Sequence, residues 1–64
     1  MKVINRAGTA IDFDSSVQFM DDDIREQVHA EGHDTEQKFF SAYEEAHERE
    51  TGEEWELSKK NPTY

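Results

Sequence analysis

Apolar residues in the second half of the chain recur at spacings of one, three and four residues, which place them on one face of a helix. This stripe consists of Phe39, Phe40, Tyr43 and Ala46. Asp34, with Gln37 three residues later, has the spacing of a capping box, and Gly52 supplies a residue suited to a left-handed helix end. The pattern predicts one amphipathic helix between Asp34 and Gly52.

The N-terminus carries two short β-type runs, residues 2–5 and 10–13, separated by a connection that contains Gly8. Glycine readily adopts the positive φ that a tight turn requires, so the pattern predicts a two-stranded hairpin. Alternation along the two strands assigns Val3, Ile11 and Phe13 to its buried face.

The residue pattern between the hairpin and the long helix predicts further helical structure. A short helical turn is expected over 16–20, capped by Asp14 or Ser15, and the acidic run 21–23 favours a second helix start, with a stop at Gly32. Three apolar residues keep an i, i+4 spacing through both pieces, so one kinked helix and two separate helices both remain open. They are Met20, Ile24 and Val28.

The C-terminal segment alternates charge with Trp55 and Leu57, which are expected to close the core as a short strand beside the hairpin or as a docked extended piece. Residues 57–64 are expected to form a tail or a final turn. The predicted fold is α+β: a single small domain over 1–64, with an N-terminal hairpin packed against two to three helices.

Composition narrows the functional classes. The chain has 64 residues and no cysteine, so neither a disulfide framework nor a thiolate metal site is expected. No apolar run approaches the roughly 20 residues of a membrane span, and the first residues lack the apolar region of a signal peptide. We therefore expect a cytosolic protein with no membrane partner.

Charge is the most informative property of the composition. The formal net charge is −9, and all 16 acidic residues lie between Asp12 and Glu56. Only three basic residues share that segment, and each has an acidic residue four positions earlier, the favourable helical orientation. The expected pairs are Asp21 with Arg25, Asp34 with Lys38, and Glu45 with Arg49. Direct binding to nucleic acid is not expected, because phosphate contacts depend on Lys and Arg.

Two Glu-x-x-His spacings raise the question of a metal site. Glu26 with His29, and Glu44 with His47, would each place a carboxylate and an imidazole on one helical face. Carboxylate-bridged di-metal bundles also need glutamates from two further helices, which this chain does not supply, and chance spacings are common in so acidic a sequence. We therefore predict no metal and no cofactor, and keep a metal-binding dimer as an alternative.

No catalytic signature is present in the sequence. There is no cysteine nucleophile, no G-x-S-x-G elbow and no phosphate-binding glycine loop. Acid–base catalysis needs carboxylates that are desolvated in a cleft, which a chain of this length hardly allows. The protein is not expected to be an enzyme.

Residues 11–29, 36–47 and 52–55 resemble a set of small acidic proteins carried by bacterial phages and mobile elements, most of them uncharacterised. In size and charge the chain also resembles anti-CRISPR and anti-restriction inhibitors that act as DNA mimics. The resemblance implies a setting, the evasion of host defence, and assigns no residue roles.

The physical logic of DNA mimicry is independent of that resemblance. Carboxylates at i, i+4 spacing lie about 6 Å apart along a helix, and such rows offer a phosphate-like field to a channel lined by Lys and Arg. Glu44 and Glu48 form such a like-charge pair. We expect an inhibitor that occupies the nucleic-acid site of a basic host defence complex, with a CRISPR effector as the leading target. The expected surface comprises Asp21, Asp22, Asp23, Glu26, Glu36, Glu44 and Glu48.

The alternative from another class is a small acidic protein-interaction module. In that case Trp55 or Phe40 would be exposed as a binding anchor, and binding would depend weakly on salt.

Overall fold

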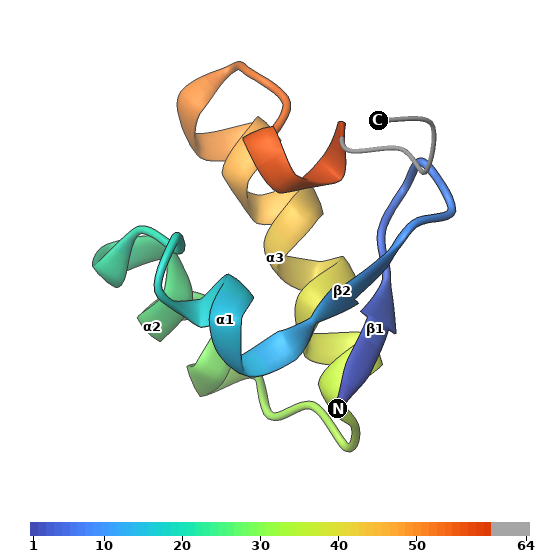
Figure 1. Ribbon diagram of the computed structural model, residues 1–64. Helices are drawn as coiled ribbons and strands as arrows, with labels where there is room; N and C mark the ends of the chain where they lie inside the picture. Colours follow the sequence, from blue (N-terminus) through green and yellow to red (C-terminus); the bar gives the residue numbers. More distant parts are fainter. Residues whose placement is uncertain (60–64) are drawn as a thin grey trace.

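The computed structural model describes residues 1–59 and shows the predicted α+β fold. The long helix α3 lies between the hairpin on one side and the helices α1 and α2 on the other (Figure 1). The elements are β1 (Lys2–Ile4), β2 (Ala10–Asp12), α1 (Phe13–Val17), α2 (Asp22–Glu31), α3 (Glu36–Thr51) and the 3₁₀ turn η1 (Glu56–Ser58).

The two strands form the predicted antiparallel hairpin, with Val3 opposite Ile11. Gly8 adopts a φ of 83° in the connecting turn, as the turn prediction requires. Val3 is buried, while Ile11 and Phe13 are half-buried and pack against the core. The assignment of the inner face is therefore confirmed for Val3 and Ile11, whereas Phe13 packs against the core as the first residue of α1.

Helix α3 begins one residue later than predicted. Its cap is Thr35, whose hydroxyl accepts a hydrogen bond from the Lys38 N–H at 3.1 Å, so the assignment of the cap to Asp34 is wrong. Gln37 does not complete a capping box either. Its side-chain amide accepts from the Ile4 N–H at 2.7 Å and donates to the Ile4 carbonyl at 2.9 Å, which ties α3 to β1. The helix ends at Gly52 in the left-handed conformation, as predicted.

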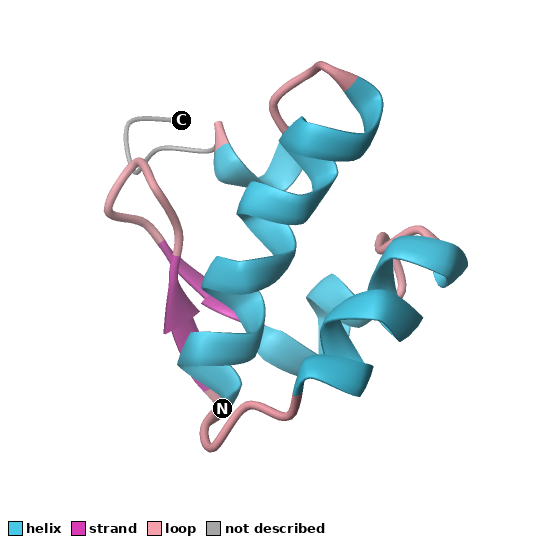
Figure 2. Ribbon diagram, turned by 180° about the vertical axis from the view of Figure 1, so that it is seen from behind, coloured by secondary structure: helices cyan, strands magenta, loops and turns pink. Residues whose placement is uncertain are grey.

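The middle region forms two separate helices, as Figure 2 shows from behind. Helix α1 starts at Phe13, and its cap is Asp12, whose carboxylate accepts from the Ser15 N–H at 3.0 Å. The expected turn over 16–20, capped by Asp14 or Ser15, is therefore wrong by about three residues. A turn at residues 18–20 separates α1 from α2, which is capped by Asp21 and ends at Gly32, close to the predicted limits.

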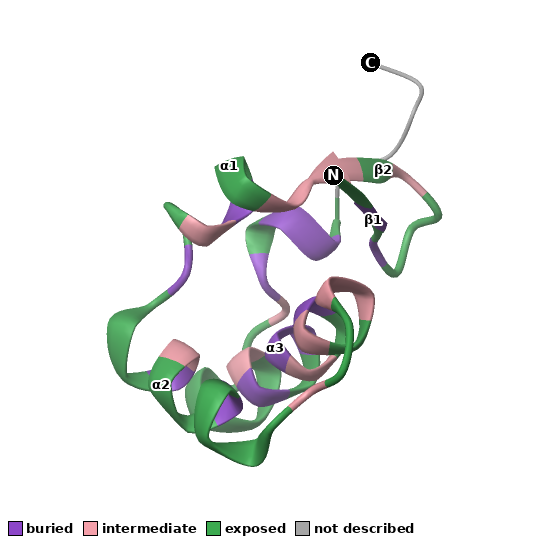
Figure 3. Cartoon of the chain, turned by 90° about the horizontal axis from the view of Figure 1, so that it is seen from below, coloured by how far each residue is buried: buried purple, intermediate pink, exposed green. Residues whose placement is uncertain are grey.

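The core lies where α3 meets the other elements, and Figure 3 shows its buried residues on the inner sides of the helices, with most of α2 exposed. Trp55 closes the core: its ring centroid lies 4.5 Å from that of Tyr43 and 5.4 Å from that of Phe40. Such aromatic contacts add to the stabilisation from apolar burial. The buried apolar residues are Val3, Met20, Ile24, Val28, Phe40, Tyr43, Ala46, Trp55 and Leu57.

The C-terminal segment packs without forming a strand. Over residues 1–59 the sheet has two strands only, and the residues after Trp55 form η1, so of the two alternatives the short strand does not form. Trp55 and Leu57 do close the core, as predicted. Leu57 and Ser58 are buried rather than part of a tail, while residues 60–64 lie outside the described part of the chain. Within that part, no helix has the length and apolar character needed to cross a membrane.

Candidate interaction surface

The start of α2 presents a group of exposed carboxylates: Asp21, Asp22, Asp23 and Glu26. Asp21 caps the helix, because its Oδ2 accepts from the N–H groups of Asp23 and Ile24, each at 3.1 Å. Acidic residues are favourable at this end of a helix, where the backbone dipole is positive. Glu26 lies one turn beyond Asp22 and Asp23, so the four carboxylates extend along one exposed stretch of α2.

The core holds this acidic start of α2 in place. The hydroxyl oxygen of Tyr43, a fully buried residue of α3, accepts a hydrogen bond of 2.7 Å from the Asp21 N–H. Burial raises the pKa of Tyr43, because the desolvated ring disfavours the phenolate. The phenol therefore stays neutral at physiological pH and fixes the backbone at the point where α2 begins.

Asp21 also lines an open groove of about 570 Å³ together with the segment that follows α3. That segment contributes Glu53 and Glu56, both exposed, and Glu54. The groove thus brings two acidic segments together that are separated by some thirty residues in sequence. We call the exposed carboxylates of these two segments the acidic face: Asp21, Asp22, Asp23, Glu26, Glu53 and Glu56.

A second group of carboxylates surrounds Arg6. Its Nη1 lies 3.0 Å from Glu48 Oε2 and 3.5 Å from Glu54 Oε2. The hydrogen bond with Glu48 is the main reason that the pKa of Arg6 is raised above its ordinary value. The Arg6 backbone N–H donates to Glu44 Oε2 at 3.1 Å. We call Arg6, Glu44, Glu48 and Glu54 the Arg6 cluster.

Glu44 is the clearest departure from the predicted surface. It is only 3% exposed, and its Oε2 also accepts a hydrogen bond of 2.7 Å from the buried Ser58 hydroxyl. The expectation that Glu44 projects its charge to a partner is wrong, because this carboxylate is enclosed and joins three segments of the fold. The repulsion expected between Glu44 and Glu48 is offset by Arg6, which lies far away in sequence.

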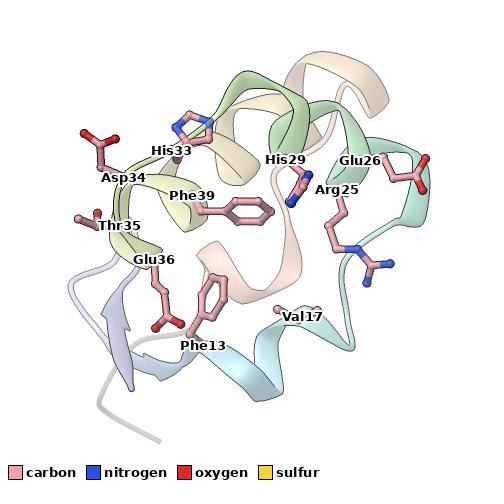
Figure 4. Close-up of a pocket in the computed structure, with 10 residues that line it drawn as sticks. All are labelled: Phe13, Val17, Arg25, Glu26, His29, His33, Asp34, Thr35, Glu36 and Phe39. Carbon is pink, nitrogen blue, oxygen red and sulfur yellow. The ribbon is translucent and has the colours of Figure 1, made fainter.

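Glu36 lies apart from both groups, in the first turn of α3. It lines a second open groove, of about 590 Å³, between α1, α2 and the start of α3. In Figure 4 the rings of Phe13 and Phe39 lie at the centre of this groove, with Glu36 beside Phe13 and Glu26 pointing away. Glu36 is half-buried, and its Oε1 has no hydrogen-bond partner among the described residues.

The Glu-x-x-His pairs do not come together. Glu26 and His29 lie on α2, whereas Glu44 is engaged by Ser58, and the Nδ1 of His47 lies 3.1 Å from the Glu53 carbonyl oxygen. Over residues 1–59, no group of three or more His, Cys, Asp and Glu side chains is arranged to hold a metal ion.

One of the three predicted local ion pairs forms, and the other two basic residues pair with different acidic residues. Lys38 pairs with Asp34 at 3.7 Å as predicted. Arg25 pairs with Asp22 at 3.3 Å instead of Asp21, which is engaged as a helix cap. Arg49 lies 3.5 Å from Glu50 rather than pairing with Glu45.

The burial of the aromatic residues is the opposite of what the interaction-module alternative expects. Trp55 and Phe40 are buried, at 3% and 0% exposure, so neither serves as an exposed anchor. Within residues 1–59 the exposed aromatic residue is Phe19, at 64%, which was not among the predicted site residues. The sequence does indicate this exposure, because Phe19 lies outside the three-residue spacing of Val17 and Met20, which face the core.

Comparison with known proteins supplies the family. No curated protein and no solved structure matches the chain. The sequence model of the family described as anti-CRISPR protein AcrIC5 matches residues 4–55, which run from the last residue of β1 to Trp55 and include all three α-helices. The chain therefore belongs to the anti-CRISPR protein AcrIC5 family and is an inhibitor that interacts with a CRISPR–Cas complex.

Proposed function

We propose that this anti-CRISPR protein inhibits its target by DNA mimicry, with the acidic face occupying a Lys/Arg-lined nucleic-acid site of the CRISPR–Cas complex. The observation that carries the proposal is the groove in which Asp21 meets Glu53 and Glu56. Two acidic segments meet there, and the carboxylates of the acidic face remain exposed.

The acidic face is also poorly neutralised from within the protein. Among the described residues, Arg25 pairs with Asp22, and Lys59 is the basic residue that lines the groove. Six carboxylates therefore face solvent with few opposing charges. Duplex DNA presents one negative charge per roughly 1.7 Å of its axis, so a protein site that binds DNA carries a matching excess of Lys and Arg. Such a site attracts a dense cluster of carboxylates, with fast and salt-sensitive association.

The placement of these carboxylates favours recognition by a rigid surface. Asp21 is fixed by two hydrogen bonds to α2 and by the Tyr43 hydroxyl, and its neighbours follow on a regular helix. A rigid array loses less conformational entropy on binding than a flexible acidic tail of the same charge.

The test is a triple neutralisation of the acidic face, Asp23→Asn with Glu53→Gln and Glu56→Gln, of which the last two residues line the groove. Asp21 is left intact because it caps α2. Each exposed ion pair contributes about 0.2–1 kcal/mol, so we expect the loss of three to weaken binding to the purified CRISPR–Cas complex about 3- to 150-fold. The dependence of the dissociation constant on salt should also become shallower, and target DNA should displace the wild-type protein.

A matched control removes three exposed charges elsewhere: Asp14→Asn, Asp34→Asn and Glu45→Gln. These side chains lie on α1, before α3 and on α3, outside the acidic face, so their loss should change affinity much less. Mimicry through the acidic face is wrong if the first variant folds yet binds like the wild type, or if both variants weaken binding equally.

A further inference from the structure

Phe19 stands out among the exposed side chains. It is 64% exposed, and the other large apolar side chains exposed within residues 1–59 are Met1 and Ile4. Phe19 lies in the turn that joins α1 to α2, two residues before Asp21. A phenyl ring at this position forgoes the apolar stabilisation that burial would supply, and a partner that covered it would recover that stabilisation.

The backbone that carries Phe19 is held on both sides. The Phe19 N–H donates to the Ser16 carbonyl at 3.0 Å, and the next N–H, that of Met20, donates to the Val17 carbonyl at 3.1 Å. Met20 itself is buried in the core, and Asp21 is bonded to the Tyr43 hydroxyl. The ring is therefore displayed from a fixed turn, which lowers the entropy lost when a partner covers it.

Phe19 also belongs to the rim of the acidic groove. It lines that groove together with Asp21, Glu53 and Glu56, and on its other side it borders a smaller hollow formed with β2 and α1. A partner that enters the groove must therefore also meet the ring. Self-association through this ring is disfavoured, because a second copy would bring its own acidic face against this one.

We propose that Phe19 takes the place of a nucleobase, stacking its ring against the guanidinium of an arginine in the nucleic-acid site while the neighbouring carboxylates take the place of phosphates. This inference rests on the proposed function and extends it. Arginine is the expected partner because its planar, weakly hydrated guanidinium stacks on aromatic faces, and because sites for single-stranded nucleic acid use the same contact with bases. A surface of carboxylates alone imitates the backbone of a nucleic acid and nothing of its bases.

The test compares three substitutions of Phe19 by their dissociation constants for the purified CRISPR–Cas complex over a series of salt concentrations. Phe19→Ala should weaken binding by about tenfold or more, in line with the loss of one base–aromatic stack. Phe19→Leu keeps apolar area but has no aromatic face, so it should lose most of the same affinity. Phe19→Trp should bind within about twofold of the wild type. Ile4→Ala, an equally simple truncation of an exposed apolar side chain, is the control and should not change binding.

The salt series separates this inference from the proposed function. Substitutions of Phe19 should shift the dissociation constant without changing its salt dependence, whereas neutralising the acidic face changes that dependence. The stacking inference is overturned if Phe19→Ala binds like the wild type, if Phe19→Leu retains full affinity, or if the free protein forms a dimer that Phe19→Ala disrupts. DNA mimicry itself fails if wild-type binding is insensitive to salt and to competing DNA, whatever the Phe19 variants show.

Discussion

The Arg6 cluster and the acidic face use the same chemical group for opposite purposes. In the Arg6 cluster, Glu44 is enclosed and accepts hydrogen bonds from Ser58 and from the Arg6 backbone, while Glu48 and Glu54 meet the Arg6 guanidinium. In the acidic face the carboxylates are exposed to solvent. Asp21 accepts hydrogen bonds from backbone N–H groups and so caps α2, instead of forming an ion pair. The first region holds the fold together, and the second leaves its charge available.

The comparison shows that net charge overstates the charge a partner can meet. The protein has a formal charge of −9, but the carboxylates of Glu48 and Glu54 are paired with Arg6, which lies far from them in sequence. The surface that a basic site would recognise is therefore smaller and more localised than composition indicates. In the proposed function it combines the start of α2, which the sequence displays, with the segment after α3, which the fold brings beside Asp21.

The largest expected effect is on stability at Glu44. Replacing Glu44 with Lys would bury an unpaired positive charge and leave the Ser58 hydroxyl and the Arg6 N–H without their acceptor. Breaking such a buried charged contact destabilises a protein by about 3–5 kcal/mol, a large share of the stability of a domain this small. We expect the Glu44→Lys variant to be largely unfolded, as measured by circular dichroism during thermal melting.

Glu45→Lys is the matched control, since it makes the same charge change at the next residue, which is exposed. It should alter the free energy of unfolding by no more than about 0.5 kcal/mol. If the two variants melted alike, the distinction between buried and exposed carboxylates on α3 would be contradicted.

A smaller effect is expected at Arg6. The Arg6→Gln variant releases Glu48 and Glu54, whose side chains are 51% and 39% exposed, so the lost ion pairs are worth less than about 1 kcal/mol in total stability. The melting temperature should fall by a few degrees, and more at low salt than at high salt. A loss comparable to that of Glu44→Lys would show instead that the guanidinium, rather than the enclosed carboxylate, organises the cluster.

The smallest effect is a pH dependence at Asp12, a half-buried residue whose carboxylate caps α1. The hydrogen bond from the Ser15 N–H lowers the pKa of Asp12, so the folded state binds its proton less readily than the unfolded chain. The stabilisation from this group is present above the unfolded pKa of about 3.9 and is lost as the pH falls through the folded pKa.

The measurement is the difference in unfolding free energy between the wild type and Asp12→Ala across pH. That difference should be constant from about pH 5 to 7 and should shrink below about pH 4, with the wild type the more stable protein on the plateau. A difference that grew toward low pH would mean that protonated Asp12 is the better cap, contrary to the direction of its pKa shift.

Much of the fold follows from local sequence rules. The hairpin, the end of α3 at Gly52 and the helix between Asp21 and Gly32 are set by short-range spacing, turn glycines and caps, which a sequence displays directly. The start of α3 was missed by one residue because Asp34 and Thr35 are both good caps, and only the backbone geometry distinguishes them. The alternation of Trp55 and Leu57 with charged residues is compatible with both a strand and a 3₁₀ turn, so the sequence pattern does not distinguish them.

The candidate surface was predictable only in part. The acidic residues at the start of α2 were identified because a run of three aspartates before an apolar stripe is visible in sequence. The role of Glu44 was not, because its partners Arg6 and Ser58 are 38 and 14 residues away. Spacing on a helix shows which face a residue occupies, but it does not show which distant segment covers that face.

The bond between Gln37 and β1 has a consequence for solubility. A two-stranded sheet leaves the outer side of each strand open, and unpaired backbone groups there are a template for adding strands from other molecules. At Ile4 the Gln37 amide accepts from the N–H and donates to the carbonyl, as a neighbouring strand would. One side chain of α3 thus acts as a substitute strand at this edge, and an incoming β-segment would have to displace it before aggregation could begin.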